Sequence, residues 1–408
     1  MRDSVSEPES AAVSVPFHLA GVSHHTAEVS VRERLSPAPE DALAWLARAR
    51  DAGTSLVVLS TCNRFELYGW GDGDPEGELR RWAASRGVAL DDGLLYRRDG
   101  TAALRHLFWV AAGLDSQIVG ETEILGQVRR AVELARRAGT TTWELEAAFA
   151  AAVSSGRRVR RETRLGRHPE SVSSAAVAQA RRCLGDSLQG RGILVLGAGE
   201  AADGVLRALD QEAPGAVVVL NRHPERAREL TAGRAGAGAA GWDEVPRALA
   251  EADVVFAATA APGPVLDAAT VAGAMEARGG RPLFVFDLAL PRNVDPAARD
   301  LPGVRLFDLD DLRLQHCPAA VADSPVLAEA ERIVRAELAR FRRRLRHRAA
   351  GPRLARLHRL AARLAEEEAN RALEQLESLT ESQREVVRRM ADRLVRRVLY
   401  PASKVLGG

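Results

Sequence analysis

The sequence contains almost no lysine: Lys404 is the only one, and the other basic side chains, histidine apart, are arginines. Schiff-base catalysis needs a lysine in the active site, and a single lysine near the C-terminus argues against that class of enzyme. Contacts with phosphate groups would have to come from arginine side chains or from the N-termini of helices.

Cysteine is also scarce, with three in 408 residues: Cys62, Cys183 and Cys317. An odd number at wide spacing argues against a disulfide framework, and the spacing does not fit a metal site. We therefore expect no bound metal and predict a cytoplasmic, reducing location.

Long apolar runs are missing as well. No segment reaches the roughly 18 uncharged apolar residues that a membrane span needs, so we expect no membrane contact. Residues 1–14 are acidic and serine-rich without an apolar centre, which predicts a disordered leader rather than a signal peptide. The formal net charge is only +2. The arginine run at 340–348 could contact nucleic acid, but we favour a solvated helix face because Phe341 and Leu345 keep the helical spacing of apolar residues.

The pentapeptide Ser60-Thr61-Cys62-Asn63-Arg64 follows an apolar run, 56–59, which predicts a buried strand. A cysteine just beyond a strand end can be presented to a substrate, and a neighbouring arginine such as Arg64 would favour the reactive thiolate. By position alone, Cys62 also fits a half-buried structural cysteine. The rest of the chain favours the nucleophile.

The segment around this strand mixes further short strands and helices. A strand is predicted at 18–22 and helices at 39–52, 102–112 and 121–137, with a polar break at 113–117 between the last two. The pattern indicates a compact α/β unit whose loops carry chemistry.

Between residues 190 and 310, apolar strands alternate with segments long enough for crossover helices, as in a parallel sheet. The expected strands are 193–196, 216–220, 254–257, 283–286 and 304–307. The first of them leads into Gly197-Ala198-Gly199-Glu200-Ala201-Ala202, which matches the G-x-G-x-x-G/A fingerprint in its strand–turn–helix context. A dinucleotide pyrophosphate would lie at the N-terminus of the following helix.

The end of the second of these strands bears on the choice of cofactor. An NAD site usually has an acidic residue there, but this chain continues Leu220-Asn221-Arg222-His223. Because Arg222 could pair with a 2′-phosphate, NADPH is the expected cofactor. The alternative is that Arg222 only faces solvent.

From residue 323 onward the chain is predicted to be helical, with apolar residues at steps of three or four. We expect Gly351-Pro352 to end one helix, Thr380 and Gln383 to cap a third, and Pro401 to stop it. The residues that the third helix should bury are Val387, Met390, Leu394 and Val398. Three amphipathic helices make a thin core, so we predict a homodimer through them.

A cysteine nucleophile combined with an NADP site suggests acyl reduction, in which a thioester forms and hydride converts it to an aldehyde. At this point the chain resembles the glutamyl-tRNA reductase family almost from end to end. The matching blocks are Gly21-Val22-Ser23-His24, Val31-Arg32-Glu33-Arg34, Ser60–Arg64 with Glu66-Leu67-Tyr68, His106-Leu107-Phe108, Val110–Ser116, Ile124-Leu125-Gly126-Gln127-Val128, Gly197–Glu200, Asn221-Arg222, Asp287-Leu288-Ala289 with Pro291-Arg292, and Asp310-Asp311-Leu312.

The resemblance implies reduction of glutamyl-tRNA(Glu) to glutamate-1-semialdehyde, the first step of the C5 route to 5-aminolevulinate and tetrapyrroles. Cys62 falls on the family's nucleophile, His106 on a histidine important for activity, and Arg64 on the clamp for the glutamyl carboxylate. The implied substrate-contacting positions, where acidic groups would hold the ammonium, are Thr61, Asn63, Ser116, Glu121, Thr122, Glu123 and Gln127.

The resemblance also implies the division of the chain. The expected parts are a leader at 1–14, a catalytic substrate-binding domain at 15–165, an NADP-binding Rossmann-like domain at 166–312, and a linker helix with a helical dimerisation domain at 313–408. Glutamate-1-semialdehyde aminomutase, the next enzyme, is a candidate partner of the dimer.

Several positions depart from the family pattern, and they cluster near the presumed site. They are Phe65, Trp109, Thr122, Glu123, His25 and Glu28, in place of threonine, arginine, proline, glutamine, a basic residue and proline. The changes at Trp109 and Glu123 together make the local charge more negative by about two. A substrate that carries a carboxylate would be repelled by this added negative charge. Two alternatives therefore stay open: a divergent non-catalytic paralogue that binds aminoacyl-tRNA or a nucleotide in a regulatory role, and a reductase of another acyl donor.

Overall fold

The computed structural model describes residues 15–116, 119–121, 123–163, 165, 171–315, 325–376 and 379–407, without the side chains of 39, 313–315, 352–353 and 401–407. The chain divides into two compact units, Met1–Val334 and Arg335–Gly408. Within the described residues no helix combines the length and the apolar character that crossing a bilayer requires.

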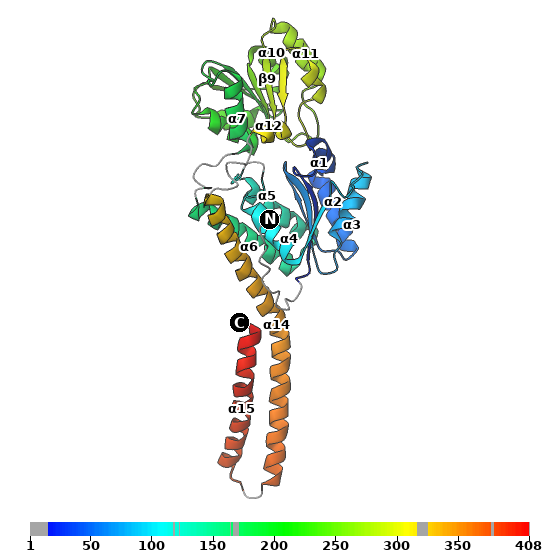
Figure 1. Ribbon diagram of the computed structural model, residues 1–408, viewed down its shortest axis with the longest axis vertical. Coiled ribbons are helices and arrows are strands. Elements are labelled where there is room, and N and C mark those ends of the chain that lie inside the picture. The colour runs from blue at the N-terminus through cyan, green and yellow to red at the C-terminus, as the bar shows by residue number, and fades with distance from the viewer. Residues whose placement is uncertain are drawn as a thin grey trace, which may run out of the picture. The chain divides into compact units, whose positions relative to one another are not determined.

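The first part of the larger unit is an antiparallel sheet between two layers of helices (Figure 1). Its strands are β1 (Phe17–Ser23), β2 (Leu56–Ser60), β3 (Arg64–Trp70) and β4 (Tyr96–Asp99), and its helices are α1 (Val29–Leu35), α2 (Pro39–Asp51), α3 (Pro75–Ser85), α4 (Gly100–Ala111), α5 (Glu123–Ala138) and α6 (Trp143–Glu162). The strand order is β2-β3-β1-β4, so β2, which leads to Cys62, lies at an edge. The strands and helices predicted here from apolar spacing are confirmed, apart from one or two residues at their ends.

Strand β3 carries charged residues into the interior of this sheet. Successive side chains of a strand point to opposite faces, so Arg64, Glu66 and Tyr68 share one face of β3. Because helices cover both faces, all three side chains are buried. A polar face this deep must be internally paired.

The second part is a parallel sheet with helices on both faces. Its strands are β5 (Gly192–Leu196), β6 (Ala216–Leu220), β7 (Ala237–Ala240), β8 (Val254–Ala257), β9 (Leu283–Asp287) and β10 (Val304–Phe307), and its helices are α7 (Val172–Cys183), α8 (Glu200–Leu209), α9 (Pro224–Thr231), α10 (Val245–Glu251), α11 (Ala268–Ala277) and α12 (Leu309–Gln315), with 3₁₀ turns η2 (Trp242–Glu244) and η3 (Pro296–Asp300). The order β10-β9-β8-β5-β6-β7 is that of the doubly wound dinucleotide-binding fold.

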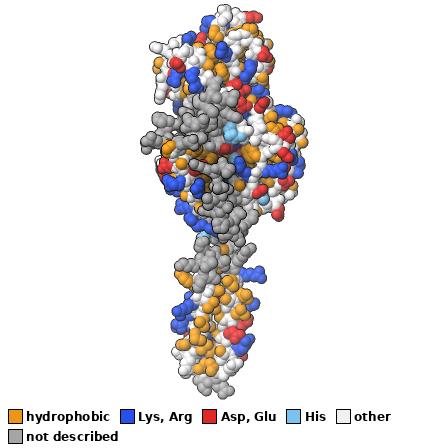
Figure 2. All heavy atoms as spheres, viewed as in Figure 1, with side chains coloured by type: hydrophobic (Ala, Val, Ile, Leu, Met, Phe, Trp, Pro, Cys, Tyr) orange, Lys and Arg blue, Asp and Glu red, His pale blue; other side chains and the backbone are white. Residues whose placement is uncertain are grey.

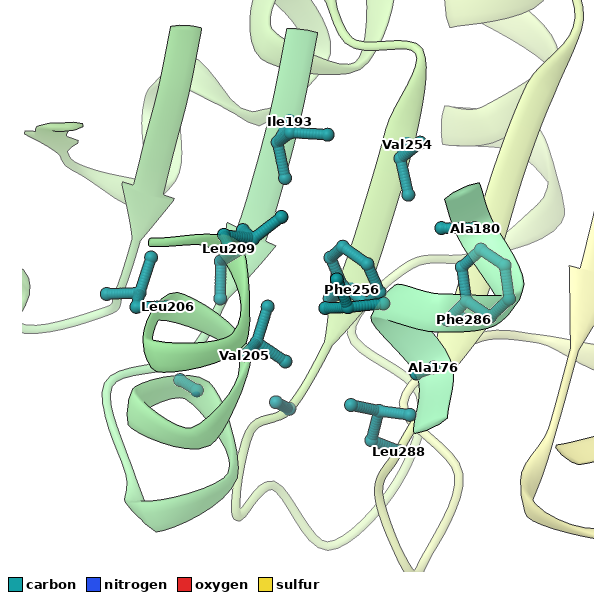
Figure 3. Packing of buried hydrophobic residues seen from close by; sticks show 14 of the residues in the cluster. Ala176, Ala180, Ile193, Val205, Leu206, Leu209, Val254, Phe256, Phe286 and Leu288 are labelled. Carbon is teal, nitrogen blue, oxygen red and sulfur yellow. The ribbon is translucent and has the colours of Figure 1, made fainter. Parts of the chain in front are cut away.

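One core of this sheet packs α7 and α8 against the strands (Figure 3). Phe256 and Phe286 stack with their ring centroids 5.4 Å apart, and Val205 and Leu209 of α8 complete the layer. The five strands predicted from the sequence are confirmed. Strand β7 was missed because its sequence, Ala-Gly-Ala-Ala, has none of the β-branched or aromatic residues typical of strands.

The C-terminal residues form two helices rather than three: α14 (Pro325–Gln375) and α15 (Glu381–Gly407). The predicted break at Gly351-Pro352 is wrong, and so is the predicted stop at Pro401. A proline removes one backbone hydrogen bond, and the glycine before Pro352 has no Cβ to clash with the proline ring. The arginine-, leucine- and alanine-rich flanks favour the helix strongly enough to continue through it.

The predicted capping box at the start of α15 is confirmed. Thr380 Oγ1 accepts a hydrogen bond from the backbone of Gln383 at 3.3 Å, and Gln383 Oε1 accepts one from the backbone of Thr380 at 2.9 Å. These two bonds satisfy N–H groups that the first turn of a helix leaves free.

The predicted burial of the last apolar stripe is wrong for the single chain. Met390, Leu394 and Val398 are 51%, 55% and 70% exposed. Hydrophobic side chains gather along the visible face of this helical hairpin (Figure 2). An apolar stripe this exposed needs a partner surface, which supports the expectation of a dimer through these helices.

Candidate active site

The loop that carries Cys62 is a tight connection between β2 and β3. Thr61 Oγ1 accepts the backbone N–H groups of Asn63 and Arg64, at 3.1 and 3.2 Å, and the Thr61 N–H donates to the Arg64 carbonyl. Thr61 and Asn63 are buried, whereas Cys62 between them is partly exposed. Part of Cys62 is therefore exposed, while the residue also packs against the apolar core of the parallel sheet.

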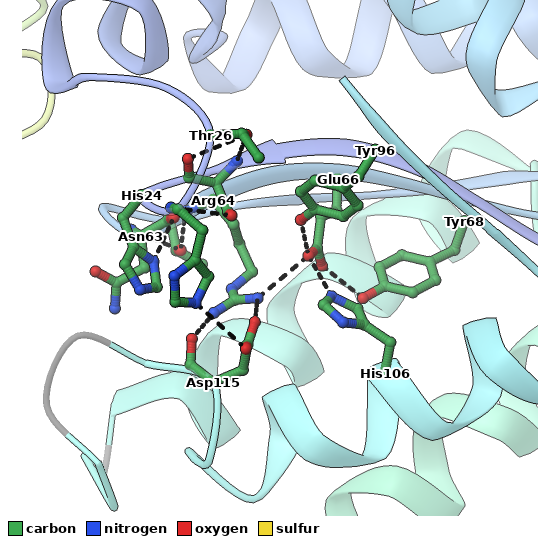
Figure 4. Close-up of polar contacts among 12 residues, drawn as sticks. His24, Thr26, Asn63, Arg64, Glu66, Tyr68, Tyr96, His106 and Asp115 are labelled. Carbon is green, nitrogen blue, oxygen red and sulfur yellow. Dashed lines mark hydrogen bonds and ion pairs between the residues drawn. The ribbon is translucent and has the colours of Figure 1, made fainter. Parts of the chain in front are cut away.

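Arg64, at the start of β3, lies in a buried ion cluster with Glu66 and Asp115 (Figure 4). Its Nη1 is 2.8 Å from Asp115 Oδ2 and 3.2 Å from Glu66 Oε1, and its Nη2 donates to the Asp115 backbone carbonyl. Burial alone would lower the pKa of Arg64, but the two carboxylates raise it above its ordinary value. The guanidinium is thus charged and fixed in place.

Glu66 is the centre of this cluster. Its Oε1 lies 2.6 Å from His106 Nε2, its Oε2 accepts from the Tyr68 hydroxyl at 2.5 Å, and the Tyr96 hydroxyl donates to it too. Burial by itself would raise the pKa of Glu66, but His106 and Arg64 outweigh burial and lower it to about 2. Glu66 is therefore ionised and connects His106 to Arg64.

The structure places His106 on α4, against Glu66 and the Tyr96 ring, whose centroid is 5.7 Å away. The hydrogen bond to a buried carboxylate orients the imidazole. The contacts of His106 go to this cluster and not to Cys62, so a role for His106 at the thiol stays a prediction.

Asn63 joins the Cys62 loop to Glu121. Asn63 Nδ2 donates to Glu121 Oε1 at 3.1 Å, and Arg160 donates to the Glu121 backbone carbonyl. Burial raises the pKa of Glu121, and it also raises that of the partly buried Glu123 at the start of α5, with help from Glu121. These two carboxyls take up a proton more readily than surface carboxyls do.

The remaining predicted substrate positions are distributed as follows. Ser116 is buried at the end of the turn after α4, and Gln127 is partly exposed on α5. Thr122, Gln117 of the polar break, the leader at 1–14 and Cys317 lie outside the described residues.

Arg64 favours the thiolate of Cys62, as expected, but other groups outweigh it in the free protein. Burial, Glu121 and Glu123 raise the pKa of Cys62 to about 12, although Arg32 and Arg64 act in the opposite direction. Arg64 is already neutralised by its two carboxylate partners. At neutral pH the Cys62 side chain is therefore a thiol.

Arg32 of α1 supports the same loop and was not singled out from the sequence. Its buried guanidinium donates to the backbone carbonyl of Cys62 and to Asp310 of α12. Asp310 also accepts the backbone N–H of Val29 at 2.7 Å. A second ion pair also joins α1 to the part of the chain with the parallel sheet: Arg292 Nε lies 2.8 Å from Glu33 Oε2.

The glycine turn after β5 fits a dinucleotide. Gly197 has φ = +109°, and a Cβ there would lie 2.3 Å from the Ala258 carbonyl oxygen. At Gly199, by contrast, a Cβ would meet nothing within 4 Å, so the N-terminus of α8 is open to a phosphate group. Ala202 is fully buried, which allows the close helix–strand packing expected of the third motif position.

The other predicted cofactor residues lie around this turn. Glu200 and Ala201 open α8 after Ala198, and Asn221 follows β6, with its Nδ2 donating to the His223 carbonyl at 3.3 Å. Arg222 is exposed at the end of β6. Glu200 pairs with Arg130 of α5, its Oε1 3.2 Å from Nη1.

Sequence reasoning missed the partners that hold the site together: Glu66, Asp115, Tyr96 and Arg32. A signal was present in β3, because Arg64, Glu66 and Tyr68 alternate on one face of a strand that is otherwise apolar. Polar residues at a spacing of two in a buried strand indicate an internal network. Asp115 could not be found this way, since it approaches Arg64 from a turn 51 residues along the chain.

The doubly wound sheet and its open glycine turn define a dinucleotide-dependent oxidoreductase. The family profile described as shikimate/quinate 5-dehydrogenase matches residues 178–314. On either side of it, the profile of the glutamyl-tRNA(Glu) reductase N-terminal domain matches residues 20–163, and that of the glutamyl-tRNA(Glu) reductase dimerisation domain matches residues 329–407.

Individual relatives cover most of the chain. A glutamyl-tRNA reductase of Thermus thermophilus is 46% identical over 301 residues, 74% of this chain and 73% of that protein. A protein named glutamyl-tRNA reductase 2, of Anaeromyxobacter dehalogenans, is 39% identical over 391 residues, 95% of this chain and 86% of that protein. The solved glutamyl-tRNA reductase of Methanopyrus kandleri is 32% identical, covering 96% of this chain and 98% of that one, with a TM-score of 0.46. The chain belongs to the glutamyl-tRNA reductase family.

Replacing Glu123 by glutamine should make Cys62 more reactive. The substitution removes one of the carboxylates that raise the thiol pKa, so the thiolate fraction at pH 8 should increase and Cys62 should react with iodoacetamide about threefold to tenfold faster. Peptide mass spectrometry would follow Cys62, with Cys183 of the same molecule as the internal control. An unchanged rate at Cys62 would show that Glu123 does not act on the thiol.

Glu66→Gln should remove a pH-dependent contribution to stability. The folded pKa of about 2 lies below the ordinary 4.5, so the stabilisation is present above pH 4.5 and is lost as the pH falls from 4.5 toward 2. At pH 7 the variant should lose about 3 kcal/mol of unfolding free energy, because Arg64 keeps a buried charge with one partner fewer. The difference from wild type should shrink at pH 3.

Urea unfolding at both pH values measures this difference, with the exposed Glu133→Gln as the matched control. A difference between Glu66→Gln and wild type that stays the same at pH 3 would mean that Glu66 is not the ionised centre of the cluster.

Proposed function

We propose that the protein reduces glutamyl-tRNA(Glu) to glutamate-1-semialdehyde with NADPH, through a thioester on Cys62, as the first step of the C5 route to 5-aminolevulinate and tetrapyrroles. The observation that carries the proposal is the partly exposed Cys62, presented between two buried polar residues in a chain of this family. None of the comparisons favours a non-catalytic paralogue.

The site offers complementary groups to a glutamyl residue. Among the described residues, the buried Asn63 Oδ1 and Arg64 Nε have no hydrogen-bond partner. A carboxylate of the substrate can accept from Arg64 Nε, and the substrate ammonium can donate to Asn63 Oδ1 near Glu121. Both unpaired atoms directly follow Cys62 in the chain, so binding the two charged ends of the amino acid brings its esterified carbonyl to the thiol.

Substrate binding also supplies the activation that the free enzyme lacks. Glu121 and Glu123 raise the pKa of Cys62, and an ammonium beside them would cancel their repulsion of the thiolate. The thiol proton would then be released when the substrate is in place, and the basic Glu123 or Glu121 is available to accept it. This order keeps the nucleophile protonated until it is needed.

The covalent step is an acyl transfer. The Cys62 sulfur forms a bond to the ester carbon, the bond from that carbon to the tRNA ribose oxygen breaks, and the ribose oxygen takes up a proton. NADPH, when bound, would supply the hydride that adds to the thioester carbon; the carbon–sulfur bond then breaks, which releases the aldehyde and returns Cys62 as the thiolate. Gly197, Gly199 and the N-terminus of α8 would hold its pyrophosphate, and Arg222 its 2′-phosphate.

The proposed assembly is a homodimer through α14 and α15, since this region matches the family's dimerisation domain and exposes an apolar stripe. Glutamate-1-semialdehyde aminomutase would consume the reactive aldehyde and is the proposed partner of the dimer.

Cys62→Ser should abolish semialdehyde formation, because a serine hydroxyl is a much weaker acid than a thiol and an oxygen ester accepts hydride less readily than a thioester does. The assay contains purified protein, charged glutamyl-tRNA and NADPH, with the product trapped as the aldehyde. Circular dichroism and light scattering should show a fold and a dimer equal to wild type, and Cys183→Ser is the matched control. Wild-type turnover in Cys62→Ser would end the nucleophile assignment.

Arg222→Gln should raise the KM for NADPH about tenfold, because one charge-assisted contact to the 2′-phosphate is lost. The KM for NADH, which lacks that phosphate, should stay within about twofold. Arg226→Gln, an exposed arginine of α9, serves as the control. Equal changes for both dinucleotides would contradict a 2′-phosphate contact at Arg222.

A further inference from the structure

The outer edge of β2 has backbone groups that the fold does not use. Thr61 bonds to Arg64 across the hairpin, so in this register Val57 and Leu59 face β3, whereas Leu56, Val58 and Ser60 turn their N–H and C=O groups outward. Nothing pairs with β2 on that side within the sheet.

Of these three residues, only Leu56 has hydrogen-bond partners for its backbone N–H and C=O groups. The Leu56 N–H donates to the Thr140 carbonyl at 3.0 Å, and the Leu56 carbonyl accepts from Thr140 Oγ1 at 2.8 Å. Among the described residues no hydrogen bond involves the backbone N–H or C=O of Val58 or Ser60. Val58 is 4% exposed, so its polar backbone atoms lie in a place where water has little access. Unpaired backbone groups at such a position are costly and point to a missing partner.

A groove of about 490 Å³ opens along this edge between α2 and α5. Its walls include the apolar Ala42, Ala131 and Leu134. Its charged lining residues are Arg137, Arg130, which pairs with Glu200, and Glu133, which pairs with Arg136. Arg137 is exposed, and within the described part of the chain no ion pair involves it. The groove thus combines apolar walls, unpaired backbone donors and acceptors, and an arginine outside any ion pair of the described residues, and its volume is that of a small-molecule site.

We propose that this groove binds the 3′-terminal adenosine of the aminoacylated RNA, an inference that rests on the proposed function. The Val58 carbonyl and the Ser60 N–H lie two residues apart on one edge. An adenine presents the complementary amino donor and ring-nitrogen acceptor on one edge. The apolar walls accept the face of the base, and Arg130 and Arg137 reach the neighbouring phosphates.

The location of the groove suits the reaction. Ser60 precedes Cys62 by two residues, a separation of at most about 7 Å along an extended chain. The ribose that carries the ester adjoins the terminal base, so a base at Ser60 leaves the ester carbon within reach of the thiol. Gln127, a predicted substrate position, lines the same groove.

A peptide strand is the other ligand that unpaired strand edges attract, but it fits less well here. Strand addition needs a row of free backbone groups, and Thr140 already occupies the edge at Leu56. Only Val58 and Ser60 remain, with two N–H and two C=O groups; a base can use one donor and one acceptor of these, and the row is too short for a strand.

The first experiment measures backbone protection in the full-length protein. Addition of the trinucleotide CCA should slow hydrogen–deuterium exchange at the Ser60 amide, whereas CCU should not at the same concentration. No added protection by CCA at saturating concentration would overturn the proposal, and so would equal protection by CCA and CCU.

The second experiment separates the groove from the thiol. Leu134→Trp fills the groove and Arg137→Glu reverses its charge; both should raise the KM for glutamyl-tRNA at least about fivefold, the effect of one lost base contact. An activated glutamyl ester of a small alcohol, which has no base, should acylate Cys62 in both variants at the wild-type rate. Arg129→Glu, an exposed arginine of the same helix outside the groove, is the matched control.

Unchanged KM values in Leu134→Trp and Arg137→Glu would overturn the groove assignment, as would an equal increase in Arg129→Glu. If the proposed function itself is wrong, wild-type protein will fail to acylate Cys62 with either substrate, a result distinct from failure of the groove.

Discussion

The buried ion pair between Arg64 and Glu66 is the interaction on which the site depends. Two opposite charges on one face of an interior strand are costly to bury and are stable only when each also has further partners. Asp115, His106 and two tyrosines complete that pairing. The result is a rigid base for the Thr61–Asn63 loop that carries the thiol.

The same burial explains why the Cys62 side chain stays protonated in the free protein. Burial, Glu121 and Glu123 raise the pKa of Cys62 and outweigh Arg32 and Arg64, which lower it. A substrate that brings its own ammonium reverses this balance. In the proposed reaction, Glu123, where the family pattern has glutamine, would make thiol activation more dependent on the substrate.

Local patterns predicted much of this architecture. Apolar spacing located β2, the parallel strands and the long helices, and the glycine turn located the dinucleotide site, because each depends on neighbours in the chain. Predictions failed where distant parts decide the outcome. The helix through Pro352 depends on the balance of its flanks, the Cys62 pKa depends on carboxylates some 60 residues away, and the pairing of Arg64 with Asp115 depends on a turn that no periodicity reveals.

The most direct test of the account is to trap the acyl enzyme. Wild-type protein is mixed with glutamyl-tRNA in the absence of dinucleotide, quenched in acid, digested and analysed by mass spectrometry. The account predicts a glutamyl thioester on the peptide that contains Cys62 and on no other cysteine. Aldehyde formation on later addition of NADPH, without any glutamyl adduct on Cys62 beforehand, would contradict it.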